Sequence, residues 1–202
     1  MKKQGRPEER KNKHMIDNYR VLEDVVRDSY SGVVWSHKIQ EKQSDIYSEK
    51  FKKMETINIG AASLTSVGII SMIFTDPLWL KMVSALISFA TIYITAYYKS
   101  FDFQKLIVSH KATANKLIAV RDQYKVLLTK IRLQSDSVEN LLLSYEGLVK
   151  EADAIYLEAP NTTDNAVDRA REALKIKLDN SFSTEEIDSF LPNSLRRRKT
   201  DE

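Results

Sequence analysis

The stretch TINIGAASLTSVGIISMIFT, residues 56–75, contains no Asp, Glu, Lys or Arg and decides the fold class. A second uncharged stretch, MVSALISFATIYITAYY, follows at residues 82–98. At about 1.5 Å per residue, a helix over the first stretch is about 30 Å long, which matches the hydrocarbon core of a bilayer. The second reaches this length once Trp79 to Lys81 are included, because a terminal lysine can extend to the headgroups. We therefore predict transmembrane helices at 56–75 and 79–98. Two buried helices of a globular core would need a covering of apolar residues, which the amphipathic remainder lacks.

Residues 76–78 connect the predicted spans and open with the pair Asp76-Pro77, which favours a turn. The spans therefore form a hairpin, and the flanking segments lie on the same side of the membrane. Within about fifteen residues of the spans the flanks carry lysine repeatedly, whereas the connection between the two uncharged stretches carries it once, at Lys81. The flanking lysines are Lys42, Lys50, Lys52, Lys53, Lys99, Lys105 and Lys111. Because positive charge accumulates on the cytoplasmic side, both termini of this multi-pass protein are predicted to be cytoplasmic.

The composition argues against an enzyme. The 202-residue chain has no cysteine, 5 Gly and 4 Pro, and its formal net charge is +3. The absence of cysteine excludes a disulfide framework, Cys-ligated metal sites and a catalytic thiol. His14, His37 and His110 are far apart in the sequence, and no phosphate-binding loop, dinucleotide fingerprint or hydrolase motif occurs. We expect no catalytic residues, no metal and no cofactor.

The segment before the spans is predicted to be helical and cytoplasmic. Residues 1–14 are expected to be a flexible basic N-terminus, which either improves solubility or is attracted to anionic lipid. Residues 15–55 show apolar positions at helical spacing, with an interruption expected at Ser31-Gly32. The second of these helices is predicted to start at Val33 and to continue straight into the first span.

The segment after the spans, residues 99–158, is predicted to form long cytoplasmic helices. Its first helix has a continuous heptad seam with steps of four and three, which we interpret as a contact surface between chains. The seam residues are Leu106, His110, Thr113, Leu117, Val120, Tyr124, Leu127 and Ile131. Ser135-Asp136-Ser137 interrupts the pattern, and Asp136 with Glu139 is expected to cap the next helix. Pro160 should end that helix.

Residues 159–202 are predicted to hold short helices and a basic tail. One helix is expected around residues 166–178, and another opens with Ser183 and Glu186. The tail Arg196–Lys199 is expected to be disordered, and contact with lipid or nucleic acid is the lesser alternative.

A stripe of hydroxyl groups runs along the second span. It consists of Ser84, Ser88, Thr91 and Thr95, in steps of 4, 3 and 4. Such residues either allow close helix packing or line a water-filled path, and the sequence favours neither. The 22 residues from Ser84 to Leu106 are about six helical turns, so the stripe would continue into the heptad seam. A face that is polar in lipid and apolar in water indicates the inside of an assembly, and we therefore predict a homo-oligomer.

The layout resembles the SLATT family of two-transmembrane effectors, which are associated with SMODS nucleotidyltransferases and SLOG domains in bacterial conflict systems. The resemblance covers roughly residues 15–155. It rests on YSGVVWSHKIQEKQSDIYSEKFKK, INIGAASLTSVGIISMIF, the hairpin DPLWLK with the second span, and FDFQKLIVSHKATANKLIAVRDQYKVLLTKI. It is a likeness of architecture, because the family has no catalytic signature.

The resemblance implies an antiviral effector in the bacterial inner membrane. Such a protein stays silent until a nucleotide signal or a sensor protein triggers it. It then oligomerises and forms a pore or disrupts the membrane, which arrests growth (abortive infection). Cyclic oligonucleotides are the expected signals, and weak candidates for phosphate contacts are Lys116, Arg121, Lys125, Lys130 and Arg132. The alternative is a non-conducting membrane scaffold that recruits a cytoplasmic partner. Nucleic acid is not an expected partner.

Overall fold

The computed structural model describes residues 7–74, 78–179 and 181–196. Over these residues the chain is all-helical, and no strand occurs among them, as predicted. The elements are α1 (Pro7–Phe74), α2 (Leu78–Phe101), α3 (Phe103–Leu133), α4 (Val138–Glu158), α5 (Asp164–Lys175), α6 (Thr184–Phe190) and the 3-10 helix η1 (Asn193–Leu195).

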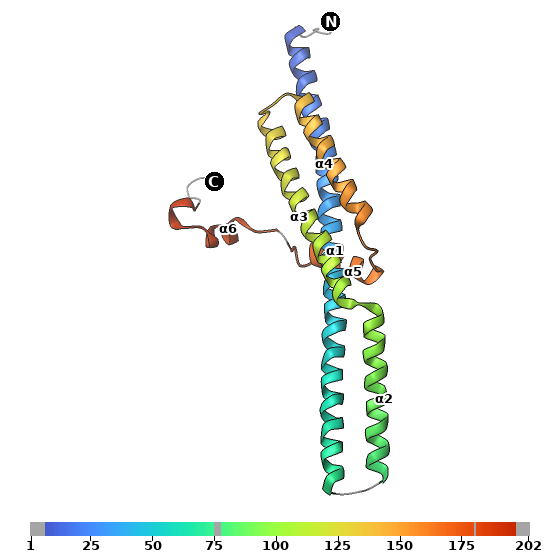
Figure 1. Ribbon diagram of the computed structural model, residues 1–202. Helices are drawn as coiled ribbons and strands as arrows, with labels where there is room; N and C mark the ends of the chain where they lie inside the picture. The colour runs from blue at the N-terminus through green and yellow to red at the C-terminus, as the bar shows by residue number, and fades with distance from the viewer. Residues whose placement is uncertain (1–6, 75–77, 180, 197–202) are drawn as a thin grey trace.

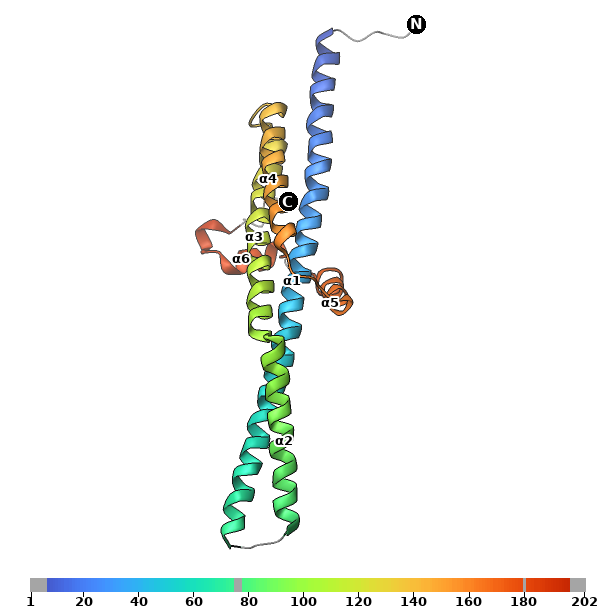
Figure 2. The same ribbon diagram turned by 45° about the vertical axis from the view of Figure 1, so that its right-hand side comes forward.

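Helix α1 runs the length of the molecule (Figure 1). At about 1.5 Å per residue it is about 100 Å long. At one end α1 pairs with α2 in an antiparallel hairpin, and at the other it packs with α3 and α4 in a three-helix bundle (Figures 1 and 2). Helix α5 packs on α1 between these two parts, and α6 extends away from the bundle. The first part of α1 and all of α3 to α6 thus lie at the same end of the hairpin.

The interruption expected at Ser31-Gly32 does not occur, because α1 is continuous. A helical glycine costs about 1 kcal/mol relative to alanine, and the Ser31 hydroxyl bonds back to the Arg27 carbonyl oxygen at 2.9 Å. Burial of Val26 and Val33 on the other side of this turn offsets that cost. The predicted continuation into residues 56–74 is confirmed. The helix begins at Pro7 rather than at residue 15, and proline is favoured in a first turn.

A break that the sequence analysis did not predict separates α2 from α3. Asp102 has φ 40° and ψ 56°, the left-handed conformation, and its carboxylate accepts a hydrogen bond from the Lys105 backbone N–H at 3.2 Å. Aspartate tolerates this conformation better than most residues. The helix axis is offset at this point (Figure 1). The six-turn count from Ser84 to Leu106 assumed one unbroken helix, and the turn at Asp102 removes that assumption.

The remaining boundaries are close to the predictions. Ser137 caps α4 by accepting from the Asn140 backbone N–H at 3.3 Å, so Asp136 is one residue too early. The Asp136 carboxylate instead accepts from Ser137 N and Asn140 Nδ2, each at 2.8 Å. Helix α4 ends just before Pro160, and the predicted capping box of α6 is present.

Candidate functional site

The hairpin is held together by a seam of small side chains. The inward residues of α1 step by three and four, and those of α2 form two adjoining rows with steps of four and three, one through Ser84, Ser88 and Thr91 and one through Ile87, Thr91 and Ile94. They are Asn58, Ala61, Thr65 and Gly68 on α1, and Ser84, Ile87, Ser88, Thr91 and Ile94 on α2. Small and hydroxylated residues let two helices approach closely without a large apolar side chain between them.

The predicted hydroxyl stripe lies on this seam. Ser84 is 9% exposed and faces Gly68, where an added Cβ would lie 2.5 Å from the Ser84 hydroxyl oxygen. At the other end of the stripe, Asn58 Nδ2 donates to Thr95 Oγ1 at 3.0 Å. The two residues between, Ser88 and Thr91, are half-buried. Within one chain the stripe therefore acts as a packing surface, and its role as a pore wall stays a prediction.

The outer face of α2 is apolar and uncovered. Leu86, Phe89 and Ile92 are 69%, 71% and 67% exposed. Among the described residues, one helix is long and apolar enough to cross a membrane, and it begins at Leu78; only 6% of its apolar stretch is buried. A core helix of a soluble protein would be mostly buried. Part of the first predicted span, which extends to Thr75, lies outside the described residues, so the second membrane crossing stays a prediction.

The predicted heptad seam on α3 lies inside the bundle. Leu106 is half-buried, and the other seam residues are fully buried. The seam residues from Leu117 to Ile131 belong to one apolar cluster, which also contains residues of α1 and α4. Helix α1 contributes Leu22, Val26 and Val33, and α4 contributes Leu141, Leu148, Ala152 and Ile155. The regular spacing is thus explained by packing within one chain. As a contact between chains, the seam stays a prediction.

Near the hairpin the bundle core becomes polar. We call this region the polar layer; its members are His37, Lys38, Gln40, Gln43 and Ser44 of α1, with His110 and Thr113 of α3, all buried. This layer was not predicted, although the sequence contains a signal for it. Val33, His37, Gln40 and Ser44 continue a seam spacing of 4, 3 and 4 with polar side chains.

Two glutamines connect the polar layer to the loop between α4 and α5. Gln40 Nε2 donates to the Pro160 carbonyl oxygen at 3.1 Å, and its Oε1 lies 2.6 Å from His110 Nδ1. Gln43 Oε1 accepts from the Thr163 backbone N–H and hydroxyl at 2.8 and 2.9 Å. Because Gln40 presents its oxygen to the histidine, His110 Nδ1 carries the proton. Burial lowers the pKa of His110, so the ring is neutral at pH 7.

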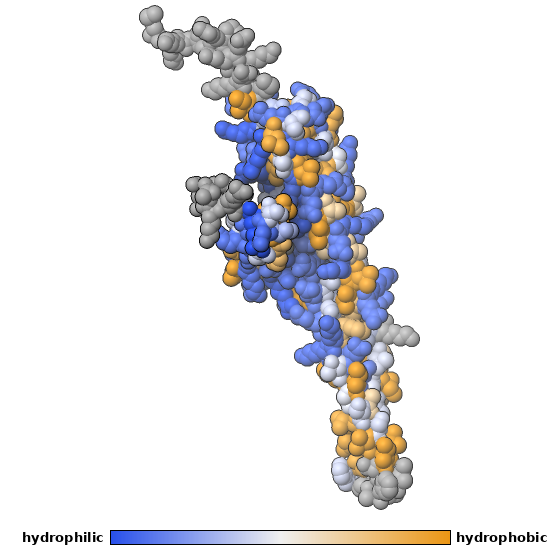
Figure 3. Space-filling model, turned by 90° about the vertical axis from the view of Figure 1, so that its left-hand side faces the viewer, coloured by the Kyte–Doolittle hydropathy of each residue, from blue (hydrophilic) through white to orange (hydrophobic). Residues whose placement is uncertain are grey.

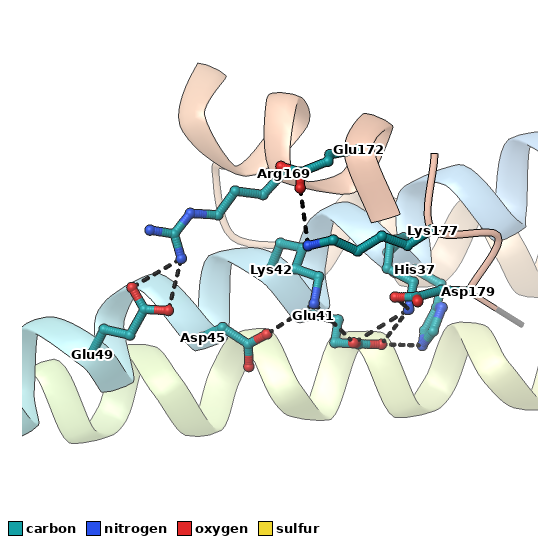
Figure 4. A network of polar contacts seen from close by, with 10 residues as sticks. His37, Glu41, Lys42, Asp45, Glu49, Arg169, Glu172, Lys177 and Asp179 are labelled. Carbon is teal, nitrogen blue, oxygen red and sulfur yellow. Dashed lines mark hydrogen bonds and ion pairs between the residues drawn. The ribbon is translucent and has the colours of Figure 1, made fainter. Parts of the chain in front are cut away.

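A charged network covers the other side of the polar layer (Figure 4). Buried Lys38 Nζ lies 3.3 Å from Glu41 and 3.6 Å from Asp179, which follows α5. Glu41 also lies 3.5 Å from His37 Nε2. Burial lowers the pKa of His37, and the nearby Glu41 opposes this shift. Helix α5 is fixed further along α1, where Arg169 Nη1 donates to both carboxylate oxygens of Glu49 at 2.8 and 2.9 Å.

The suggested phosphate contacts on α3 do not form a cationic pocket. Four of the five are paired with carboxylates: Lys116 with Glu158 at 3.0 Å, Arg121 and Lys125 with Asp122 at 2.9 and 4.0 Å, and Arg132 with Glu23 at 2.8 Å. Lys130 borders a groove of about 260 Å³ between α3 and α4. In the part of the chain that the structure describes, no three His, Asp or Glu side chains gather as metal ligands would.

Residues 22–186 match the family described as SMODS and SLOG-associating 2TM effector domain family 4. The chain belongs to the SLATT family. The match extends from the bundle part of α1, through the hairpin, to the capping box of α6. Comparison with curated proteins and with solved structures returned no match. The resemblance drawn from the sequence is therefore confirmed, and membership in SLATT indicates a membrane effector domain of conflict systems.

Proposed function

We propose that this SLATT protein is a non-enzymatic effector of bacterial anti-phage defence. A nucleotide signal or a sensor protein activates it, after which it oligomerises and permeabilises the inner membrane. The family description supports the effector role and the association with SMODS or SLOG partners. The observation that carries the membrane role is the exposed apolar surface of the hairpin below a charged bundle (Figure 3).

Both termini of the proposed effector lie in the cytoplasm. The bundle and the first part of α1 occupy one end of the hairpin, so a hairpin that crosses twice leaves both on one side. The end of the hairpin next to the bundle carries several lysines, such as Lys50 and Lys53, whereas the opposite end carries Lys81. Because positive charge accumulates on the cytoplasmic side, this difference favours a cytoplasmic position for the bundle. The bundle is then placed where a cytoplasmic signal can reach it.

Oligomers are needed because one hairpin cannot enclose a path, and its hydroxyl stripe already packs against α1. The side of α1 turned away from α2 offers a second small-residue surface. Its small residues are Ala62, Ser63 and Ser66, all exposed, and the exposed Ile59 and Ile70 lie among them. Their hydroxyls bond to carbonyls in their own helix, Ser63 to Ile59 at 2.9 Å and Ser66 to Ala62 at 3.0 Å. We propose that this surface forms the contact between hairpins in lipid.

Dye release from liposomes tests the proposal. The purified chain is reconstituted and challenged with a panel of cyclic oligonucleotides, and release on addition of one of them identifies both a pore and its signal. Ser66→Leu should reduce release and oligomer size, because the larger side chain keeps hairpins apart. Ala85→Leu, on an exposed face of α2, adds the same bulk elsewhere and should release dye like the parent chain.

A non-conducting scaffold is the second candidate, and the C-terminal arm favours it. Residues 181–195 extend from the bundle and expose large apolar side chains, including Phe182 at 64% and Phe190 at 78%. Correctly inserted protein that releases no dye with any nucleotide, but binds a cytoplasmic partner through this arm, would replace the effector by the scaffold.

A further inference from the structure

A pocket of about 440 Å³ opens where the hairpin meets the bundle. Residues of three helices line it, and these helices meet at this junction (Figure 1). It is lined by Lys50, Lys53, Met54 and Ile57 of α1, Ile94 and Tyr97 of α2, and Phe103 of α3. Its volume lies within the range of about 300–1,000 Å³ found for small-molecule sites.

The lining is arranged by polarity. On α1, Lys50, Lys53 and Ile57 are three and four residues apart, so they share one helix face. The two lysines lie toward the bundle, and Ile57 lies toward the hairpin with Ile94 opposite. The pocket therefore has a cationic end at the charged part of the molecule and an apolar end at the part that enters lipid.

The charge of Lys50 and Lys53 has no counterpart within the described part of the chain. Both side chains are exposed, and neither forms an ion pair with a described carboxylate. Other lysines of α1 are paired, since Lys38 contacts Glu41 and Lys42 contacts Asp45 at 3.3 Å. Two unpaired ammonium groups above an apolar wall fit an amphiphile with an anionic head.

We propose that this pocket binds one anionic phospholipid. The phosphate lies between Lys50 and Lys53, and an acyl chain packs along Met54, Ile57 and Ile94. The inference rests on the proposed membrane insertion of the hairpin. It does not require a pore. A soluble nucleotide fits less well, because beyond the two lysines the lining is mostly apolar and offers its base and sugar one hydrogen-bonding side chain, Tyr97.

The bound lipid would contact all three helices at the left-handed turn of Asp102. Phe103, which forms part of the pocket, is the first residue of α3 after that turn. Binding would therefore stabilise the observed offset between α2 and α3. The lipid composition of the membrane would influence the stability of the junction between hairpin and bundle.

Native mass spectrometry of the purified chain in detergent tests the site. Phosphatidylglycerol is titrated against phosphatidylcholine, and we expect phosphatidylglycerol adducts at lower lipid concentration. Lys50→Gln with Lys53→Gln should weaken phosphatidylglycerol binding by about tenfold or more, because two cationic contacts are lost. The matched control, Lys52→Gln with Lys105→Gln, removes the same charge outside the pocket and should bind like the parent chain.

A second variant tests the apolar end. Ile94→Trp fills the pocket and should reduce adducts of both lipids, while circular dichroism confirms that the helices remain. Equal binding by the two lysine double variants would overturn the proposal, as would equal binding of the two lipids. Displacement of phosphatidylglycerol by a cyclic oligonucleotide would assign the lysines to a soluble ligand instead. This site and the proposed pore can fail separately, because lipid binding is measured in detergent and permeabilisation is measured in liposomes. A chain that binds phosphatidylglycerol but releases no dye would support this site and contradict the pore.

Discussion

Gly68 determines how closely α1 approaches α2. An added Cβ at this position would lie 2.5 Å from Ser84 Oγ, whereas Gly60 has nothing within 4 Å. We expect Gly68→Ala to be less stable than Gly60→Ala by about 1–3 kcal/mol, the usual cost of overpacking. Thermal unfolding in detergent measures the difference. Adding Ser84→Ala removes the clashing oxygen and should restore most of the loss. A Gly68→Ala chain as stable as Gly60→Ala would mean that the helices are not in contact here.

The buried histidines make the bundle sensitive to mild acid. Burial lowers the pKa of both His37 and His110 from the ordinary value of 6.5, so the unfolded chain binds protons more readily than the folded chain. Stability should therefore be constant above about pH 7 and fall as the pH drops through 6.5. Protonation of the carboxylates with lowered pKa, such as Glu49 and Asp136, destabilises only in more acidic solution, below their ordinary values of 4.5 and 3.8.

Melting temperatures at pH 7.5 and pH 5.5 test this prediction. The parent chain should lose stability on acidification. The double variant His37→Gln with His110→Gln should lose less, because it keeps hydrogen-bonding side chains and removes both titrating rings. The prediction is wrong if the double variant and the parent chain show the same loss.

At the scale of elements, periodicity predicted the helices better than it predicted their interruptions. Apolar residues in steps of four and three predicted α3, Pro160 predicted the end of α4, and the pair Ser183 and Glu186 predicted the capping box of α6. Gly32 was misjudged because burial on the opposite side of α1 outweighs a local preference. The left-handed turn at Asp102 could not be predicted because a single aspartate between Phe101 and Phe103 also fits a continuous helix.

Asp102 provides a test of the break between α2 and α3. Asp102→Asn keeps the capping side chain and tolerates a positive φ. Asp102→Gly loses the cap but still tolerates a positive φ. Asp102→Ala loses the cap, which contributes about 1 kcal/mol, and the left-handed conformation costs alanine about 1–2 kcal/mol more. We expect melting temperatures in the order Asp and Asn, then Gly, then Ala. An Asp102→Ala chain as stable as the parent would show that α2 and α3 can join in a straight helix.

At the scale of the whole molecule, the continuity of α1 makes the bundle and the hairpin one structure. The polar layer, the loop at Thr163 and the seam at Gly68 all contact the same helix. The hydroxyl stripe and the heptad seam were recognised from the sequence and the polar layer was not, and the partners of the recognised residues could not be assigned. A stripe of Ser and Thr has the same spacing whether it faces α1 or another chain, and only the tertiary arrangement distinguishes the two. The same holds for the heptad seam, whose spacing suits α4 as well as a second α3.

The absence of cysteine makes the membrane topology directly measurable. Trp79→Cys places a thiol at the tip of the hairpin, where the side chain is 66% exposed, and Leu143→Cys places one on the bundle, where it is 64% exposed. A membrane-impermeant maleimide should label Trp79→Cys in intact spheroplasts and Leu143→Cys only after lysis, because two crossings leave the bundle in the cytoplasm. The parent chain should stay unlabelled in both conditions. Labelling of both variants before lysis would place the bundle outside the cell. Protection of both until lysis would mean that the hairpin does not cross the membrane, and with that result the effector proposal would fail.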